Sequence, residues 1–400
     1  MAIRRFICGA VGSLVIAPAA VAQDNFDTLD ALEALNESLV EVRDENRSDR
    51  ILLRPMIDMQ PAPSGVDERR AASLLAPGGR GWDAASAWAE SSEQQAVIEA
   101  LLSIGGYDDP LLGKAFAQPY GIEALAAEPD GLDFIAAGLY TELGDPPLIA
   151  AAQTDALLGR LDDVICLAHV EATRLADAGE VVKAIEVLMH AGLLGRQMAD
   201  RPLMAEALWG WRVVSEMLER IRDVVYVDVR GVSPVLTSSD LRPIVSLLDA
   251  DNGRKDFSEA QVPAGDLLAA LELIQATFPV RGKPDPDLFG PTMARMAATG
   301  FPLRLFGESA RWATAAESHA NRFDTARRLS ALANDMRFRW SRNWHDAALR
   351  RPSAYARLQE SPEIRAEFSV IAETVPDPEP VFIARQLAYT EARGTQHALA

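Results

Sequence analysis

The acidic stretch 249–259 holds residues whose types and spacing are suited to binding a metal ion. Its oxygen donors surround a glycine, Gly253, that allows a sharp turn. Calcium takes about six to eight oxygen ligands and favours a bidentate carboxylate at the end of its loop. The residues that we assign to such a site are Asp249, Asp251, Asn252, Asp256 and Glu259.

The same stretch resembles the calcium-binding loop of EF-hand proteins with one residue missing after Asp251. Helical sequence precedes and follows it, as in that motif. Lys255 stands where the motif has an apolar residue, and the sequence contains no second loop. The alternative is a solvated acidic connection between helices, because Asp and Gly are typical turn residues. Calcium is therefore the one cofactor that the sequence suggests.

A second group of residues suited to binding is the region 304–365, where tryptophans and phenylalanines are interleaved with arginines. Guanidinium groups beside aromatic rings bind anionic or sugar-like ligands. On one continuous helix, Trp340 and Trp344 would share a face. The alternative is that the tryptophans are core residues and the arginines pair with acidic helices elsewhere. The arginines are Arg304, Arg311, Arg322, Arg327, Arg328, Arg337, Arg339, Arg342, Arg350, Arg351, Arg357 and Arg365.

The familiar catalytic and nucleotide-binding patterns are missing from this sequence. Its five histidines have no second His or Cys at metal-binding spacing, and it has no Gly-x-Ser-x-Gly, phosphate-binding glycine loop or dinucleotide fingerprint. Cys166 lies in an apolar run without a basic neighbour, which indicates a buried residue. We therefore expect a non-enzymatic scaffold or binding protein. An exported hydrolase with a site built from scattered helical residues is the alternative.

The N-terminal residues 1–22 have the three parts of a signal peptide. Arg4 and Arg5 supply the positive charge, Phe6–Ala20 is apolar, and Ala20-Val21-Ala22 is a small-x-small cleavage site. We expect a secreted protein, periplasmic or extracellular, and the sequence leaves open general or twin-arginine export. No later segment reaches about 18 uncharged apolar residues, so we do not expect the mature chain to be membrane-embedded.

The composition is that of an acidic globular protein. The 400 residues are 48% hydrophobic and 24% charged, with a formal net charge of -19. This charge repels a polyanion such as nucleic acid. A protein or a component of the cell envelope is the partner that we expect.

Helical periodicity dominates the sequence after the signal peptide. Ala, Leu and Arg fill its segments and are good helix formers, whereas alternating β-branched residues are sparse. We predict an all-α protein, an irregular helical array or bundle with little or no sheet. Two segments are expected to be extended, the Pro- and Gly-rich stretch 50–81 and the valine-rich stretch 224–236.

These patterns predict five parts of the chain. They are a signal peptide at 1–22, an N-terminal helix and connector at 23–81, a helical core at 82–282, an Arg/Trp-rich helical region packed on that core at 283–375, and a C-terminal helix and tail at 376–400.

The stretch 172–191 resembles one tetratricopeptide helical hairpin. Its small and large packing residues fall near the spacings of that repeat, although Arg196 stands where a closing proline belongs and no second copy follows at a fixed period. The layout as a whole also resembles uncharacterised exported helical proteins of bacteria, for example at Phe116-Ala117-Gln118-Pro119, which implies no activity. The hairpin residues are Ala172, Leu175, Gly179, Ala184, Leu188 and Ala191.

Overall fold

The computed structural model describes residues 30–105, 114–231, 234–248, 260–297, 305–343 and 345–400. Over these ranges the chain forms nineteen α-helices, three short 3-10 helices and no strand, with only two isolated β-bridges. The prediction of an all-α protein is therefore confirmed. The helices are α2 (Ala31–Val40), η2 (Asp44–Asn46), α3 (Ser48–Met56), α4 (Arg69–Ser73), α5 (Trp82–Ala89), α6 (Ser92–Ser103), α7 (Ile122–Ala126), α8 (Gly131–Ala136), η3 (Ile149–Ala151), α9 (Asp155–Asp177), α10 (Val181–Ala199), α11 (Met204–Arg230), α12 (Ser238–Leu248), α13 (Gly265–Thr277), α14 (Pro286–Ala297), α15 (Leu305–Ser318), α16 (Arg322–Trp340), η6 (Ala347–Arg350), α17 (Ala354–Leu358), α18 (Pro362–Glu367), α19 (Ser369–Thr374) and α20 (Glu379–Leu399).

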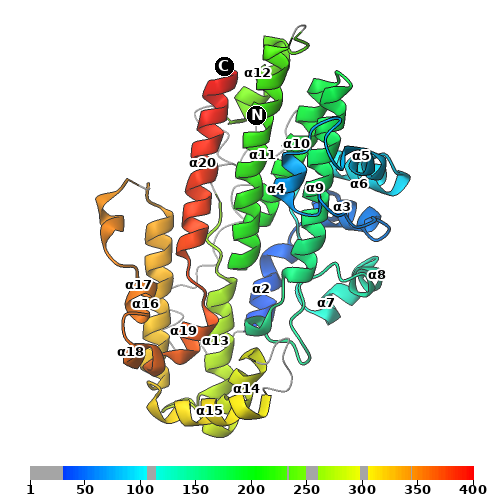
Figure 1. The fold of residues 1–400 in the computed structure, drawn as a ribbon. Coiled ribbons are helices and arrows are strands. Elements are labelled where there is room, and N and C mark those ends of the chain that lie inside the picture. Colours follow the sequence, from blue (N-terminus) through cyan, green and yellow to red (C-terminus); the bar gives the residue numbers. More distant parts are fainter. Residues whose placement is uncertain (1–29, 106–113, 232–233, 249–259, 298–304, 344) are drawn as a thin grey trace, which may run out of the picture.

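Three long consecutive helices, α9, α10 and α11, form the centre of the fold (Figure 1). The turn between α9 and α10 depends on Gly179, whose φ of 79° is left-handed and costs glycine little. The small residues Ala172, Ala184 and Ala191 are fully buried where these helices pack. The structure thus has a helical hairpin here, and its kinship with tetratricopeptide repeats stays a prediction.

The closest approach in this centre is between α10 and α11, where Gly195 faces Gly210. A methyl group added at Gly210 would fall on the carbonyl oxygen of Gly195 and on the backbone nitrogen of Ala199. Only glycine lets two helix backbones come this near. The pair therefore fixes the position of α11 against α10.

The short helices of the N-terminal third pack along one side of this centre (Figure 1). A buried polar cluster joins them to the junction of α10 and α11. Glu206 accepts hydrogen bonds from the hydroxyl groups of Tyr120 and of Thr141 (2.7 Å), and it forms an ion pair with Arg201. Arg201 in turn donates to the carbonyl oxygen of Gln118 at 2.5 Å.

The C-terminal third places α13–α19 at one end of the molecule, the lower one in Figure 1, and α20 returns along α11. The face of α20 that packs inward carries Val381, Ala384, Ala388 and Ala392, all buried. Small side chains at this spacing let the two helices lie close together. The opposite flank of α20 remains free to line a surface.

One helix start follows from its sequence, whereas both predicted extended segments are partly helical. Ser361 caps α18 by accepting the backbone N–H of Ile364, and proline follows at the first helical position, an arrangement that both residue types favour. The predicted connector 50–81 contains most of α3 and all of α4. The prediction of an extended segment over the valine-rich stretch 224–236 is wrong for residues 224–230, because α11 continues to Arg230. Burial of Val224 and Val225 against the core outweighs their β-propensity.

Candidate functional site

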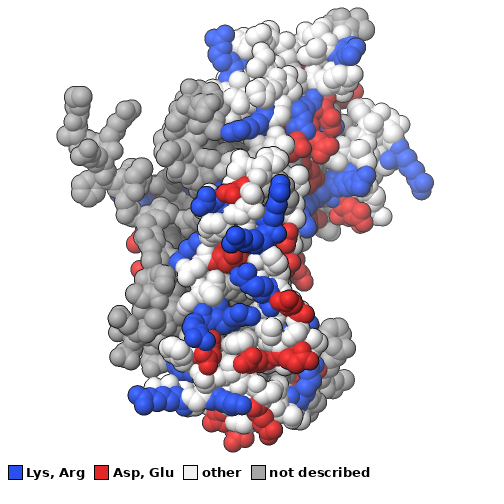
Figure 2. All heavy atoms as spheres, turned by 90° about the vertical axis from the view of Figure 1, so that its left-hand side faces the viewer, with Lys and Arg blue, Asp and Glu red and all other residues white. Residues whose placement is uncertain are grey.

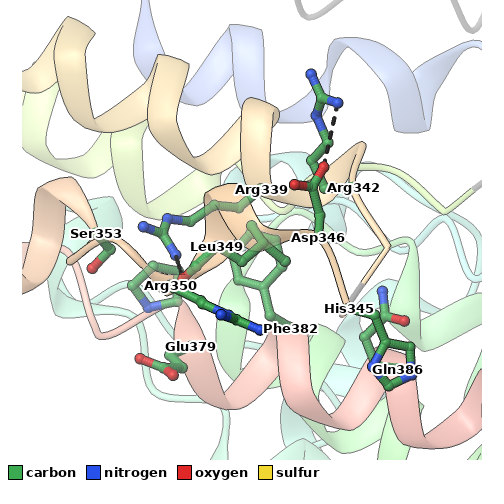
Figure 3. A pocket seen from close by; sticks show the side chains of 11 residues that line it. Arg339, Arg342, His345, Asp346, Leu349, Arg350, Ser353, Glu379, Phe382 and Gln386 are labelled. Atoms are coloured by element: carbon green, nitrogen blue, oxygen red, sulfur yellow. Dashed lines mark hydrogen bonds and ion pairs between the residues drawn. The ribbon is translucent and has the colours of Figure 1, made fainter.

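Two adjoining cavities lie along α20 where it faces the C-terminal end of α16 and the described residues after it, 341–343 and 345–353. The first has a volume of about 350 Å³ and the second about 740 Å³. Both are lined by Arg342, His345 and Gln386. We call the two cavities together the α20 groove. Figure 3 shows the first one, with Leu349 and Phe382 at its centre and His345 and Gln386 at one end.

The helix α20 supplies one wall of the groove from a single stripe of its surface. Glu379, Phe382, Gln386, Tyr389 and Arg393 follow one another at steps of three or four residues and line one cavity or the other. Residues at this spacing share a helix face. The stripe is available because α20 buries a different face against α11.

The opposite wall is held in place by Arg339 near the end of α16. Its guanidinium group donates to Asp335 at 2.9 Å, to the carbonyl oxygen of Leu349 at 3.4 Å and to that of Arg351 at 2.6 Å. Asp335 also accepts the backbone N–H of Ala354 at 2.8 Å. Arg339 and Asp335 therefore act as a clamp that holds residues 349–354 against α16.

Trp340 closes the base of the wall. It is only 7% exposed, and its indole N–H donates to the carbonyl oxygen of Ala260 at 2.8 Å. The guanidinium group of Arg385 lies 4.4 Å from its ring centre and donates to its carbonyl oxygen. Trp340 and Arg385 thus join α16 to α20, and burial lowers the pKa of Arg385.

Three other arginines of the groove are exposed. Arg342 forms an ion pair with Asp346 at 3.4 Å, and its guanidinium group lies 4.8 Å from the ring centre of Phe338. Arg350 and Arg393 make no hydrogen bond or ion pair with any described residue. Cations without partners are solvated and free to bind an anionic group.

The charge of the groove is opposite to that of the chain. Five arginines line it, Arg339, Arg342, Arg350, Arg385 and Arg393, against two carboxylates, Asp346 and Glu379. The whole sequence has a net charge of -19. Figure 2, which views this side of the molecule, shows basic side chains gathered along the middle of the face with acidic ones among them. The groove is a local positive site on an acidic protein.

A serine, a histidine and an aspartate line the first cavity, but they do not form a catalytic triad. The hydroxyl of Ser353 accepts the backbone N–H of Ala356, and Asp346 accepts that of Ala348. Figure 3 shows Ser353 and His345 at opposite ends of the cavity. A nucleophile and its base must lie within hydrogen-bond reach. These residues therefore lack the geometry for acyl transfer.

A third cavity of about 470 Å³ lies on the other flank of α20, against α11. It is lined by Arg212, Glu216 and Glu219, so carboxylates outnumber arginines there. Ile383 and Leu387 border both this cavity and the α20 groove. The positive character is thus confined to one side of α20.

The most strongly perturbed carboxyl groups lie away from these three cavities. Burial raises the pKa of Asp266 to about 6 and that of Glu272 to about 7. Asp266 accepts the backbone N–H of Met204 and Glu272 that of Ile149, each at 2.8 Å. These carboxylates fasten α13 to the starts of α11 and η3, a structural role. Burial also raises the pKa of Cys166 to about 12, so its thiol is a core residue.

The site residues predicted from the sequence have different outcomes. The stretch Asp249–Glu259 lies outside the described residues, so calcium binding there stays a prediction. Over the parts of the chain that the structure describes, no three His, Cys, Asp or Glu side chains are grouped to hold a metal. Trp344 is also outside the described residues, and the helix α16 that was to continue through it ends at Trp340.

The arginine-rich region 304–365 divides between the two interpretations that the sequence left open. Trp312 and Trp340 are buried, as the core interpretation predicts. The arginines with partners mostly pair with acids close in sequence, such as Arg311 with Glu308, and not with distant acidic helices. Arg342 and Arg350 line the groove, as a binding region would.

The half of the groove that α20 supplies was missed by sequence reasoning. The signal was present in the spacing of Gln386, Tyr389 and Arg393, but nothing in the sequence says which face of that helix is buried.

Comparison of the chain with known protein families, curated proteins and solved structures finds no match. Of the described helices, none is both long and apolar enough to cross a membrane.

Proposed function

We propose that this protein is an exported, non-catalytic binding protein that holds an anionic partner in the α20 groove. The observation that carries the proposal is the excess of arginines over carboxylates in the groove of a chain with net charge -19. An acidic protein gains solubility from its charge, so a concentrated positive site on it needs another purpose. Arg350 and Arg393, without partners among the described residues, are the groups available to a ligand.

Contacts with the rest of the fold hold both walls of the groove. The clamp at Arg339 fixes one wall, and the packing of α20 on α11 fixes the other. A preformed site loses less conformational entropy on binding than a flexible one. The volumes of both cavities fall within the range of about 300–1,000 Å³ that is common for ligand sites.

The predicted export of the protein, which rests on its N-terminal residues, supports the same proposal. The features of residues 1–22 direct the protein to the periplasm or the outside of the cell. Anionic groups of proteins and of the cell envelope are abundant partners in those places. Binding, not catalysis, is favoured because Ser353, His345 and Asp346 do not form a catalytic arrangement.

The test is direct binding of labelled polyanions to the purified mature protein. Fluorescein-labelled poly-glutamate and heparin are titrated with wild type and with the double variant Arg342→Glu/Arg393→Glu. Arg212→Glu is the matched control. Arg212 is an exposed arginine of α11, and it lines the third cavity, on the far flank of α20. We expect at least one polyanion to bind, and the double variant to weaken binding about tenfold or more. Absence of binding to wild type, or equal weakening by Arg212→Glu, would refute the proposal.

A further inference from the structure

We infer that the natural partner of the α20 groove is an extended acidic peptide segment that also carries large apolar side chains. This inference rests on the proposed function and names the chemistry of its ligand. The length of the groove, the order of polar and apolar groups along it, and a side-chain amide without a partner among the described residues point to such a segment.

The length of the groove fits a short extended peptide. Its stripe on α20 runs from Glu379 to Arg393. At about 1.5 Å of rise per residue these fourteen steps cover about 21 Å. An extended chain advances about 3.3–3.6 Å per residue, so about six residues of peptide match the groove end to end. Two adjoining cavities in a row suit an elongated ligand better than a compact one.

The walls alternate between apolar and basic groups. Leu349 and Phe382 lie at the centre of the first cavity (Figure 3). Beside the second, Ile383 is 38% exposed and Leu387 is 54% exposed. Arginines lie next to both apolar patches, with Arg350 at the first and Arg393 at the second. A partner that satisfies this order carries apolar side chains with carboxylates between them.

The junction of the two cavities offers a group that matches a peptide backbone. The side-chain amide of Gln386 lines both cavities and makes no hydrogen bond with any described residue. A primary amide both donates and accepts, which is the pairing that the N–H and C=O of a peptide bond require. At the middle of the groove it would hold the backbone of an extended segment.

Other polyanions fit these walls less well. An anionic sugar stacks on an open ring face, but Trp340 is only 7% exposed and Arg385 lies over its ring. A lipid chain needs a continuous apolar path, which Gln386 and His345 interrupt. A nucleic acid has no aliphatic side chains to place against Leu349 and Leu387.

The experiment is selection of random 12-residue peptides displayed on phage. The selection runs in parallel on the immobilised wild type, on Arg342→Glu/Arg393→Glu and on the control Arg212→Glu. We expect peptides enriched on wild type and on the control to be rich in Asp and Glu and to contain Leu, Ile or Phe. The same peptides should not be enriched on the double variant.

The most enriched peptide is then synthesised and its affinity measured by fluorescence anisotropy. We expect Arg342→Glu/Arg393→Glu to weaken it about tenfold or more and Gln386→Leu about threefold, with Arg212→Glu within about twofold of wild type. Circular dichroism checks that each variant is folded, and Arg342→Ala/Arg393→Ala replaces the double variant if it is not.

Two results separate this inference from the proposed function. If poly-glutamate or heparin binds wild type but selected peptides lack acidic residues or bind the double variant equally, the peptide inference is overturned and the anionic groove stands. Tighter binding of heparin or of phosphatidylglycerol vesicles than of every selected peptide also overturns it. If neither poly-glutamate nor heparin binds wild type, the proposed function itself fails, and the peptide inference fails with it.

Discussion

Arginines have different surroundings in two regions of this protein. At the junction of α10 and α11, Arg201 is 2% exposed and its guanidinium group is taken up by Glu206 and by the carbonyl oxygen of Gln118. In the α20 groove, Arg350 and Arg393 are exposed and have no partner among the described residues. A buried, fully paired arginine supports the fold, whereas an exposed, unpaired one is available to a ligand. The comparison predicts that substitutions in the two regions affect different measurements.

The largest effect is expected from Glu206→Ala in the buried cluster. It leaves the charge of Arg201 and the hydroxyl groups of Tyr120 and Thr141 without their partner. Breaking a buried ion pair in this way costs about 3–5 kcal/mol of unfolding free energy. Urea denaturation measures the loss. Glu219→Ala, an exposed carboxylate on the same helix, is the control, and an equal loss there would contradict a special role for the cluster.

The next largest effect is expected from Gly210→Ala. The added methyl group meets the backbone of α10, which cannot move aside without separating the helices. We expect a loss of about 3 kcal/mol in thermal or urea unfolding. The control is Gly159→Ala in α9, where nothing lies within 4 Å of the new methyl group. There the gain in helix propensity should raise stability by about 0.5–1 kcal/mol.

A smaller effect is expected in the pH dependence of stability. Burial raises the pKa of Glu272 to about 7, above its value in the unfolded chain, so the native state binds more protons between these two values. The stabilising contribution of this group is complete below its unfolded pKa and is lost as the pH rises towards 7. Between pH 5 and 8, the unfolding free energy of Glu272→Gln should therefore rise by about 1–2 kcal/mol relative to that of wild type. This is less than the full pKa shift implies, because the carboxyl is partly exposed.

That change is measured by urea denaturation of both proteins across the pH range. Burial raises the pKa of Asp266 to about 6, so this group also makes the unfolding free energy fall as the pH rises. It does so in both proteins, and its effect cancels in the difference between them. A difference in stability that is constant with pH would show that Glu272 titrates normally.

The smallest effect on stability is expected from the groove itself. Arg393→Ala removes an exposed side chain without partners among the described residues, so unfolding free energy should change by less than about 0.5 kcal/mol. Arg201→Ala, measured under the same conditions, should lower the unfolding free energy several times more than Arg393→Ala does. Similar losses for both would remove the distinction between the two regions.

The sequence was a good guide to the fold where local signals agreed with packing. The helical structure of the described chain and the turn at Gly179 within the predicted hairpin agree with the sequence. It failed where tertiary contacts overrule propensity, as at Val224 and Val225, which are buried in a helix. The proline of α3 did not end its helix either, because Pro55 lies in the last turn.

The candidate site could be predicted only in part. The arginine-rich region drew attention to Arg342 and Arg350 through composition alone. Their counterparts Gln386 and Arg393 lie some forty residues later, and they join the site because α20 buries its small residues against α11. Which exposed arginines lack partners depends on tertiary packing as well, since Arg339 and Arg350 look equivalent in the sequence.

The most direct test of the division between the two regions measures folding and binding on the same protein. Urea midpoint and affinity for labelled poly-glutamate are determined for wild type and for Arg342→Glu/Arg393→Glu. We expect the midpoint to stay where it is while the affinity falls at least about tenfold. Unchanged affinity, or a midpoint lowered as far as that of Glu206→Ala, would contradict the proposal that the groove arginines bind a ligand.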